Sequence, residues 1–223
     1  MNVREVQVLS EMSLEEWRCE LTKFPKFSAV IPSEEYQQLA WSGLLEAVDF
    51  SNPKTLAYKK MASIFIPCLL KDAPLVGKGL VNAKTTIGKM RSPNHVTEAR
   101  LLVIDIDEMN ENLFNASLAK FREDNVTFAW YCTFSQDRPD QKGMDVRLLV
   151  PIDRALDSHA YADAARGLGV RYFNQPFNAI LSQQQSIHVL QEEIHSLRAR
   201  ITPENVEGGV ISADLLISGV AHV

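Results

Sequence analysis

The stretch Leu101-Leu102-Val103-Ile104-Asp105-Ile106-Asp107 is an apolar run that ends in two carboxylates. Side chains alternate between the two faces of a strand, so a strand here places Asp105 and Asp107 on one face and Ile104 and Ile106 on the other. Two carboxylates about 7 Å apart repel one another unless a cation lies between them. The stretch predicts a site for a hard divalent ion, Mg²⁺ or Mn²⁺, completed by phosphate or water. An ordinary acidic turn after a strand is the alternative.

Length and composition indicate a soluble globular protein. The chain has 223 residues, of which 46% are hydrophobic and 23% charged, which fits one compact domain. No apolar stretch reaches the roughly 18 residues of a membrane span, and residues 1–5 do not begin an apolar signal-peptide core. Cys19, Cys68 and Cys132 are odd in number and far apart, which is typical of reduced thiols. We therefore expect a cytoplasmic protein without membrane contact.

Charge is distributed unevenly along the chain. The net charge is −5, but residues 51–100 contain 9 lysines and arginines against 2 acidic residues, so this segment carries +7 and the remainder −12. Such asymmetry can direct an anionic ligand to one surface of the protein. A solvated basic loop is the alternative interpretation.

Regular structure is predicted most clearly after Arg100. The pattern predicts strands at about 100–107, 126–134 and 146–152, a helix at about 111–124, and a helix from the cap Asp157 to about Tyr172. The order β-α-β-β-α is typical of an α+β fold in which a split, RRM-like sheet carries helices on one face.

Aromatic residues concentrate on the second of these strands. Phe128, Trp130 and Phe134 share one face of it, with Tyr131 on the other. An exposed aromatic face stacks bases in some RNA-binding sheets, whereas packing against the helices is the commoner role of such a face. The second interpretation is favoured.

The segment before the sheet is predicted to be helical over residues 1–66. Ser13 and Glu16 have the spacing of a capping box, which predicts a helix through about Phe24. A second helix is expected from Pro32-Ser33 to Ala47, and a third from Asn52-Pro53. Residues 67–181 then form the α+β core, beginning with a basic loop at 67–99.

Residues 182–223 are predicted to form a C-terminal helix and tail. Within them, apolar residues recur at alternating steps of three and four, as in a short heptad pattern: Ile187, Leu190, Ile194 and Leu197. Packing of this helix on its own domain is the favoured reading. A surface for a partner protein, or for a second copy in a homodimer, is the alternative.

Four segments, taken in order, resemble the archaeo-eukaryotic primase superfamily. They are the loop containing Arg91, the strand ending in Asp105 and Asp107, the strand end Thr133-Phe134-Ser135, and residues 146–154. The similarity is to primase-polymerase-like replication proteins of phages, plasmids and phage satellites, and it covers roughly residues 60–190. It implies a bacterial host cell, the RRM-like fold and nucleotidyl transfer.

The resemblance also implies roles for individual residues. Asp105 and Asp107 correspond to catalytic metal ligands, so that two ions would clamp the attacking oxygen and the leaving pyrophosphate. Nucleotide phosphates would contact Ser135, Gln136, Arg147 and Arg91. The motifs are degraded, because Gln136 stands where the family has His and Asn178 where a third motif has Asp. For Arg147, a salt bridge to the acidic pair is the alternative to a phosphate contact.

Three functions are compatible with these observations. The first is metal-dependent nucleotidyl transfer, or a weakened remnant of it, in replication of a mobile element. The second is a catalytically inactive, primase-derived protein that binds a phage replication or DNA-packaging protein and redirects it. The third is binding of origin DNA through the basic residues of 71–100.

Overall fold

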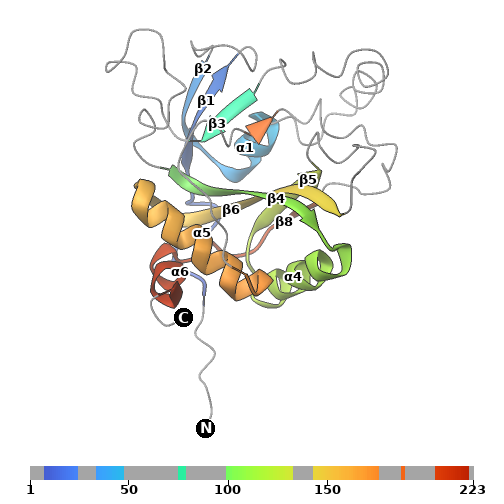
Figure 1. Ribbon diagram of the computed structural model, residues 1–223. Coiled ribbons are helices and arrows are strands. Elements are labelled where there is room, and N and C mark those ends of the chain that lie inside the picture. Colours follow the sequence, from blue (N-terminus) through green and yellow to red (C-terminus); the bar gives the residue numbers. More distant parts are fainter. Residues whose placement is uncertain are drawn as a thin grey trace, which may run out of the picture.

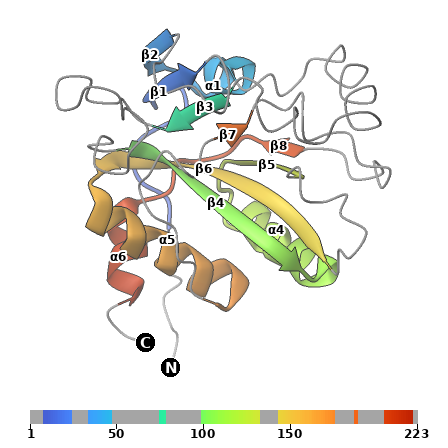
Figure 2. The same ribbon diagram turned by 45° about the horizontal axis from the view of Figure 1, so that its top comes forward.

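The structure, a computed structural model, describes residues 8–24, 34–47, 75–78, 99–132, 143–175, 187–188 and 204–220. In chain order its elements are β1 (Cys19–Phe24), β2 (Glu34–Leu39), α1 (Trp41–Ala47), β3 (Leu75–Lys78), β4 (Ala99–Met109), α4 (Glu111–Glu123), β5 (Phe128–Cys132), β6 (Met144–Leu156), α5 (Ser158–Phe173), β7 (Ile187–His188), β8 (Glu204–Val206) and α6 (Ala213–Val220). Figures 1 and 2 show two sheets, a smaller one of β1, β2, β3 and β7 and a larger one of β4, β5, β6 and β8. Helices α4, α5 and α6 lie on the face of the larger sheet that points away from the smaller sheet. The predicted α+β class is confirmed.

The larger sheet is antiparallel and has the order β4-β6-β5-β8. Its strands β4, β5 and β6 and the helices α4 and α5 lie where the sequence predicted them. The predicted cap Asp157 is confirmed, since its side chain accepts the backbone N–H groups of His159 and Ala160 at the start of α5. Strand β6 lies between β4 and β5 and is antiparallel to β4, so residues at the end of β4 lie beside residues at the start of β6.

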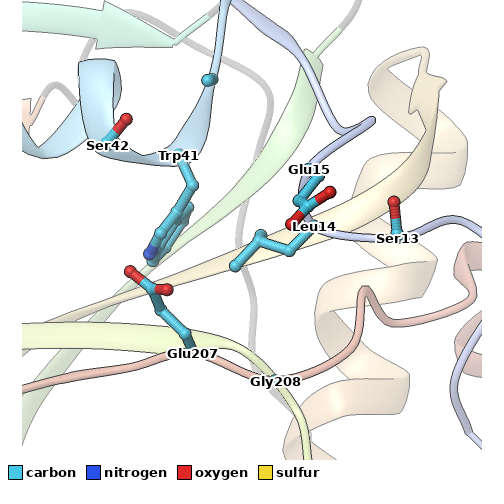
Figure 3. A pocket seen from close by; sticks show the side chains of 8 residues that line it. Ser13, Leu14, Glu15, Trp41, Ser42, Glu207 and Gly208 are labelled. Atoms are coloured by element: carbon cyan, nitrogen blue, oxygen red, sulfur yellow. The ribbon is translucent and has the colours of Figure 1, made fainter.

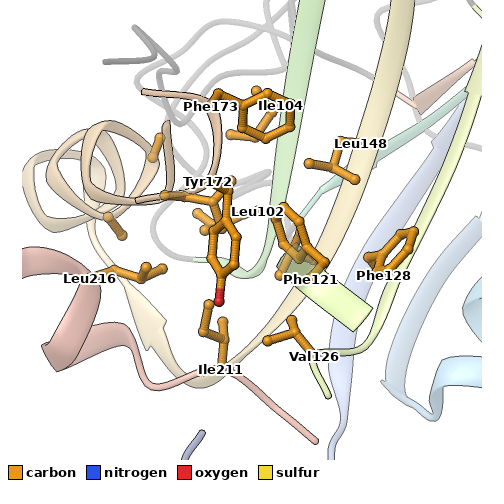
Figure 4. Close-up of a cluster of buried hydrophobic side chains, with 14 of the residues drawn as sticks. Leu102, Ile104, Phe121, Val126, Phe128, Leu148, Tyr172, Phe173, Ile211 and Leu216 are labelled. Carbon is orange, nitrogen blue, oxygen red and sulfur yellow. The ribbon is translucent and has the colours of Figure 1, made fainter. Parts of the chain in front are cut away.

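One face of this sheet packs against the helices in a core rich in aromatic residues (Figure 4). Phe121 of α4 stacks on Tyr172 of α5, with ring centroids 3.9 Å apart, and also contacts Phe128. Phe128 and Trp130 are 0% and 6% exposed. Their favoured role in the core is therefore confirmed, and neither ring is available to stack a base.

The other face is covered by the N-terminal segment. Trp17, Cys19 and Trp41 are buried against Leu101, Val103 and other apolar side chains of the sheet. The indole of Trp17 also donates a hydrogen bond of 3.0 Å to the Ile152 carbonyl on β6. Both faces of the sheet are thus buried near its middle, which explains the nearly continuous apolar runs of β4 and β6.

The predicted helix at 13–24 is wrong. The capping-box bonds do form, because the Ser13 N–H donates to the Glu16 carboxylate at 3.1 Å and the Glu16 N–H donates to the Ser13 hydroxyl at 3.2 Å. They close only one turn, after which Trp17 enters the core and β1 begins at Cys19. Pairing of β1 with β2 and β3 replaces the local helix, so tertiary contacts override a satisfied local signal.

The second N-terminal prediction is partly wrong. Residues 34–39 form β2 rather than a helix, and only Trp41–Ala47 are helical, as α1. The basic loop at 67–99 contains the strand β3 and the first residue of β4. The helix predicted from Asn52-Pro53 lies outside the described residues.

The C-terminal helix prediction is wrong where it can be compared. Ile187 and His188 form β7, at the edge of the small sheet β2-β1-β3-β7. Leu190, Ile194 and Leu197 lie outside the described residues. Strand β8 and helix α6 were not predicted; β8 pairs with β5, and α6 packs on α5. Within the described ranges, no helix is long and apolar enough to cross a membrane.

Candidate functional site

The acidic pair lies at the end of β4, where the strand leaves the covered part of the sheet. Ile104 and Ile106 belong to the core on the helical side. Asp105 and Asp107 are exposed and continue the row of Leu101 and Val103 on the opposite face. The predicted placement of both carboxylates on one face of a strand is therefore confirmed.

Arg147 lies directly across from Asp105 on β6. One terminal nitrogen of its guanidinium donates to both carboxylate oxygens of Asp105, each at 3.1 Å. The Arg147 side chain is only 7% exposed, whereas that of Asp105 is 35% exposed. The salt bridge named as the alternative for Arg147 is thus formed, while its contact with a phosphate stays a prediction.

This geometry holds one carboxylate in place and leaves part of it accessible. A carboxylate has about four acceptor positions, and the two bonds from Arg147 take up one on each oxygen of Asp105. Arg147 also supplies a positive charge beside two negative ones, which reduces the repulsion between Asp105 and Asp107. Part of the Asp105 side chain and the residue Asp107 thus remain accessible to solvent.

The residues suit a hard cation that also binds a phosphate. Among the residues that the structure describes, no three His, Cys, Asp or Glu side chains gather closely enough to hold a metal ion by themselves. Mg²⁺, however, is usually bound by one or two carboxylates together with substrate phosphates and water. The donor set of Asp105 and Asp107 fits that mode of binding, and it does not fit a cation enclosed by protein alone.

One charged residue of this face was missed in the sequence. Asp145 is two residues before Arg147 on β6, lies opposite the end of β4, and is fully buried. The signal was present, because residues two apart on a strand share a face and β6 is the neighbour of β4. It could be used only once the pairing of the two strands was known.

Other predicted site residues lie outside the described part of the chain. These are Arg91, Ser135, Gln136 and Asn178, together with Lys71, Lys84 and Lys89 of the basic segment 71–100. Their proposed contacts with nucleotide or DNA stay predictions.

A pocket of about 490 Å³ lies elsewhere, in the N-terminal layer (Figure 3). The turn at 13–15, the start of α1 and residues 207–208 line it. Glu15 and Glu207 contribute carboxylates, and Trp41 contributes its indole, which donates a hydrogen bond of 2.9 Å to Asn205. A pocket with two carboxylates disfavours an anionic nucleotide, so it does not compete with the acidic pair as the phosphate site.

No family model, curated protein or solved structure matches this chain. Function therefore has to be inferred from its own residues and their geometry.

Proposed function

We propose that this chain is a primase-polymerase-like replication protein of a mobile element, in which Asp105 and Asp107 bind the polyphosphate of a nucleotide through a divalent cation. The observation that carries the proposal is the exposed acidic pair on one face of β4, with the buried Arg147 directly across from it. The centre is either an active nucleotidyl-transfer site or a weakened remnant of one.

The order of the sheet supports kinship with the primase superfamily. Strands β4, β5 and β6 occur in the sequence pattern β-α-β-β-α, and β6 lies between the other two. Helices α4 and α5 both pack on one face of this sheet, and the acidic pair is on the other. An RRM-like split sheet would have this order for its first three strands.

The residues of the site have separable tasks. Arg147 orients the Asp105 carboxylate, and Asp107 adds a second oxygen ligand on the same face. A divalent ion bound there would neutralise phosphate charge and activate the attacking oxygen.

The test measures binding and turnover separately. Binding of Mn²⁺ with a nucleoside triphosphate is followed by isothermal titration calorimetry, and primer synthesis is followed on single-stranded DNA. Asp107→Asn should weaken the binding at least about tenfold, because an amide is a poor ligand for a hard cation. Glu123→Gln, at an exposed position of α4, is the matched control and should bind as the unaltered chain does. Equal binding by the unaltered chain and Asp107→Asn would refute the proposal.

A second candidate function is binding without catalysis. The Arg147–Asp105 salt bridge favours it, since it gives one of the two carboxylates a structural role that needs no substrate. Nucleotide binding without primer synthesis would support this candidate. The phage replication or packaging protein proposed as its partner would have to be found by capture from infected cells.

Binding of origin DNA through residues 71–100 is not favoured by any described contact. A steep loss of DNA affinity with rising salt would support it, because phosphate contacts release counterions.

A further inference from the structure

The end of β4 contains a β-bulge formed by Asp107 and Glu108. The register pairs Ile106 with Val146 and next Met109 with Met144. Two residues of β4, Asp107 and Glu108, therefore stand opposite the single residue Asp145 of β6. Glu108 has φ 53°, in the left-handed region that residues other than glycine seldom occupy. Such a conformation persists only where the surroundings hold it.

Asp145 holds this bulge with its side chain. Its Oδ1 accepts a hydrogen bond of 2.8 Å from the Glu108 N–H. That N–H belongs to the peptide group that joins Asp107 to Glu108, so the bond fixes the ψ angle of Asp107. The Asp145 carboxylate is fully buried, and its desolvation costs free energy. The hydrogen bond from the Glu108 N–H, which the bulge removes from the strand ladder, offsets part of this cost.

Gly143 also lies close to this bulge. A Cβ atom at residue 143 would lie closer than 3.0 Å to the Glu108 carbonyl group and to the Met109 oxygen. The backbone just before β6 thus touches the backbone just after Asp107. No side chain fits between them, so two independent contacts define the position of the bulge.

We propose that Asp145 is a positioning residue, which presents Asp107 beside Asp105 by holding the bulge and so sets the affinity of the acidic pair for a divalent cation. This inference rests on the proposed function of the pair. Asp145 does not itself contact the ligand, because it is fully buried. Arg147 and Asp145 of β6 thus have parallel roles. Arg147 orients Asp105 directly, and Asp145 orients Asp107 through the Glu108 N–H.

The experiment uses the full chain and Mn²⁺ alone, with binding measured by electron paramagnetic resonance. Asp145→Ala removes the acceptor and should weaken Mn²⁺ binding about 10- to 100-fold, as loss of outer-shell partners does at other metal sites. Asp145→Asn keeps an oxygen at the same place and should restore affinity to within about threefold of the unaltered chain. Gly143→Ala displaces the bulge without a change of charge and should weaken binding as Asp145→Ala does.

The matched control is Asp153→Ala. Asp153 also lies on β6 and also accepts a backbone N–H, that of Ala213 at 3.0 Å, but at the other end of the strand. Its loss should lower stability and leave Mn²⁺ affinity unchanged. If Asp145→Asn bound Mn²⁺ as weakly as Asp145→Ala does, Asp145 would act by its charge or as a ligand. That result would overturn the inference.

A second readout does not depend on the metal. Hydrogen exchange of the Glu108 amide should accelerate in Asp145→Ala and stay slow in Asp145→Asn. Unchanged exchange in Asp145→Ala would overturn the positioning role whatever the Mn²⁺ data show. If the unaltered chain fails to bind Mn²⁺ while Glu108 exchange responds as expected, the proposed function fails and the role of Asp145 in holding the bulge stands.

Discussion

Removal of the Asp105 carboxylate should destabilise the fold as well as alter the candidate site. Asp105→Ala takes away the partner of a guanidinium that is only 7% exposed. The chain contains a matched pair for comparison, Arg154 and Asp214, in which the arginine also comes from β6. That pair is shorter, 2.6 Å against 3.1 Å, but its side chains are 46% and 76% exposed.

Burial rather than distance should decide which loss is larger. Exposed ion pairs contribute about 0–1 kcal/mol, because water screens the charges and the side chains lose entropy. A buried pair broken by removal of one partner loses about 3–5 kcal/mol. In the Arg147–Asp105 pair only the arginine is buried, so the loss should lie between these two limits. We expect Asp105→Ala to lower the free energy of unfolding by about 2 kcal/mol. Asp214→Ala should lower it by less than about 1 kcal/mol.

Urea denaturation followed by tryptophan fluorescence measures both effects, since Trp17, Trp41 and Trp130 are buried. A loss of about 2 kcal/mol moves the midpoint by about 1 M if the slope is about 2 kcal/mol per molar. A double-mutant cycle with Arg147→Met should give a coupling energy of about 1–2 kcal/mol. A loss for Asp214→Ala equal to or larger than that for Asp105→Ala would refute the reasoning from burial.

Two further predictions concern the sheet around the site. The Val103 N–H on the edge strand β4 donates to the buried Tyr161 hydroxyl at 2.8 Å. Tyr161→Phe leaves this N–H without its acceptor and should lower the free energy of unfolding by about 1–3 kcal/mol. A urea midpoint unchanged from the original chain would contradict this prediction. Partial burial raises the pKa of Glu204, but hydrogen bonds from Arg122 and Trp130 outweigh this and lower it overall. A lowered folded-state pKa stabilises the fold above the ordinary glutamate value of about 4.3, and this contribution is lost as the pH falls through the folded-state pKa. The stability difference between the original chain and Glu204→Gln should therefore shrink on acidification, and a difference that is constant with pH would contradict the assignment.

The part of the fold that was predicted correctly is the part with strong local signals. Strand β4 is an apolar run with two charges at its end, and α4 and α5 have amphipathic spacing and a capping residue each, Asn110 and Asp157. The strand or helix preference of these segments depends on residues close together in the sequence, so the local pattern was sufficient to identify them.

The N-terminal segment was predicted wrongly because its local and long-range preferences differ. Ser13 and Glu16 make the bonds of a helix start, and yet Trp17 is buried against the sheet 135 residues away in sequence at Ile152. The burial of a tryptophan and the pairing of β1 outweigh one helical turn. No window of sequence around residue 13 contains that information.

The sequence by itself determined that Asp105 and Asp107 share one face of a strand, because alternation along a strand needs no partner. Only the tertiary structure decided what surrounds them. The register between β4 and β6 pairs Arg147 with Asp105, and the two side chains form a salt bridge. The bulge brings the Glu108 N–H within hydrogen-bond distance of the Asp145 carboxylate. Registers between strands are set by the packing of both sheet faces and by bulges, and these depend on residues far apart in the chain.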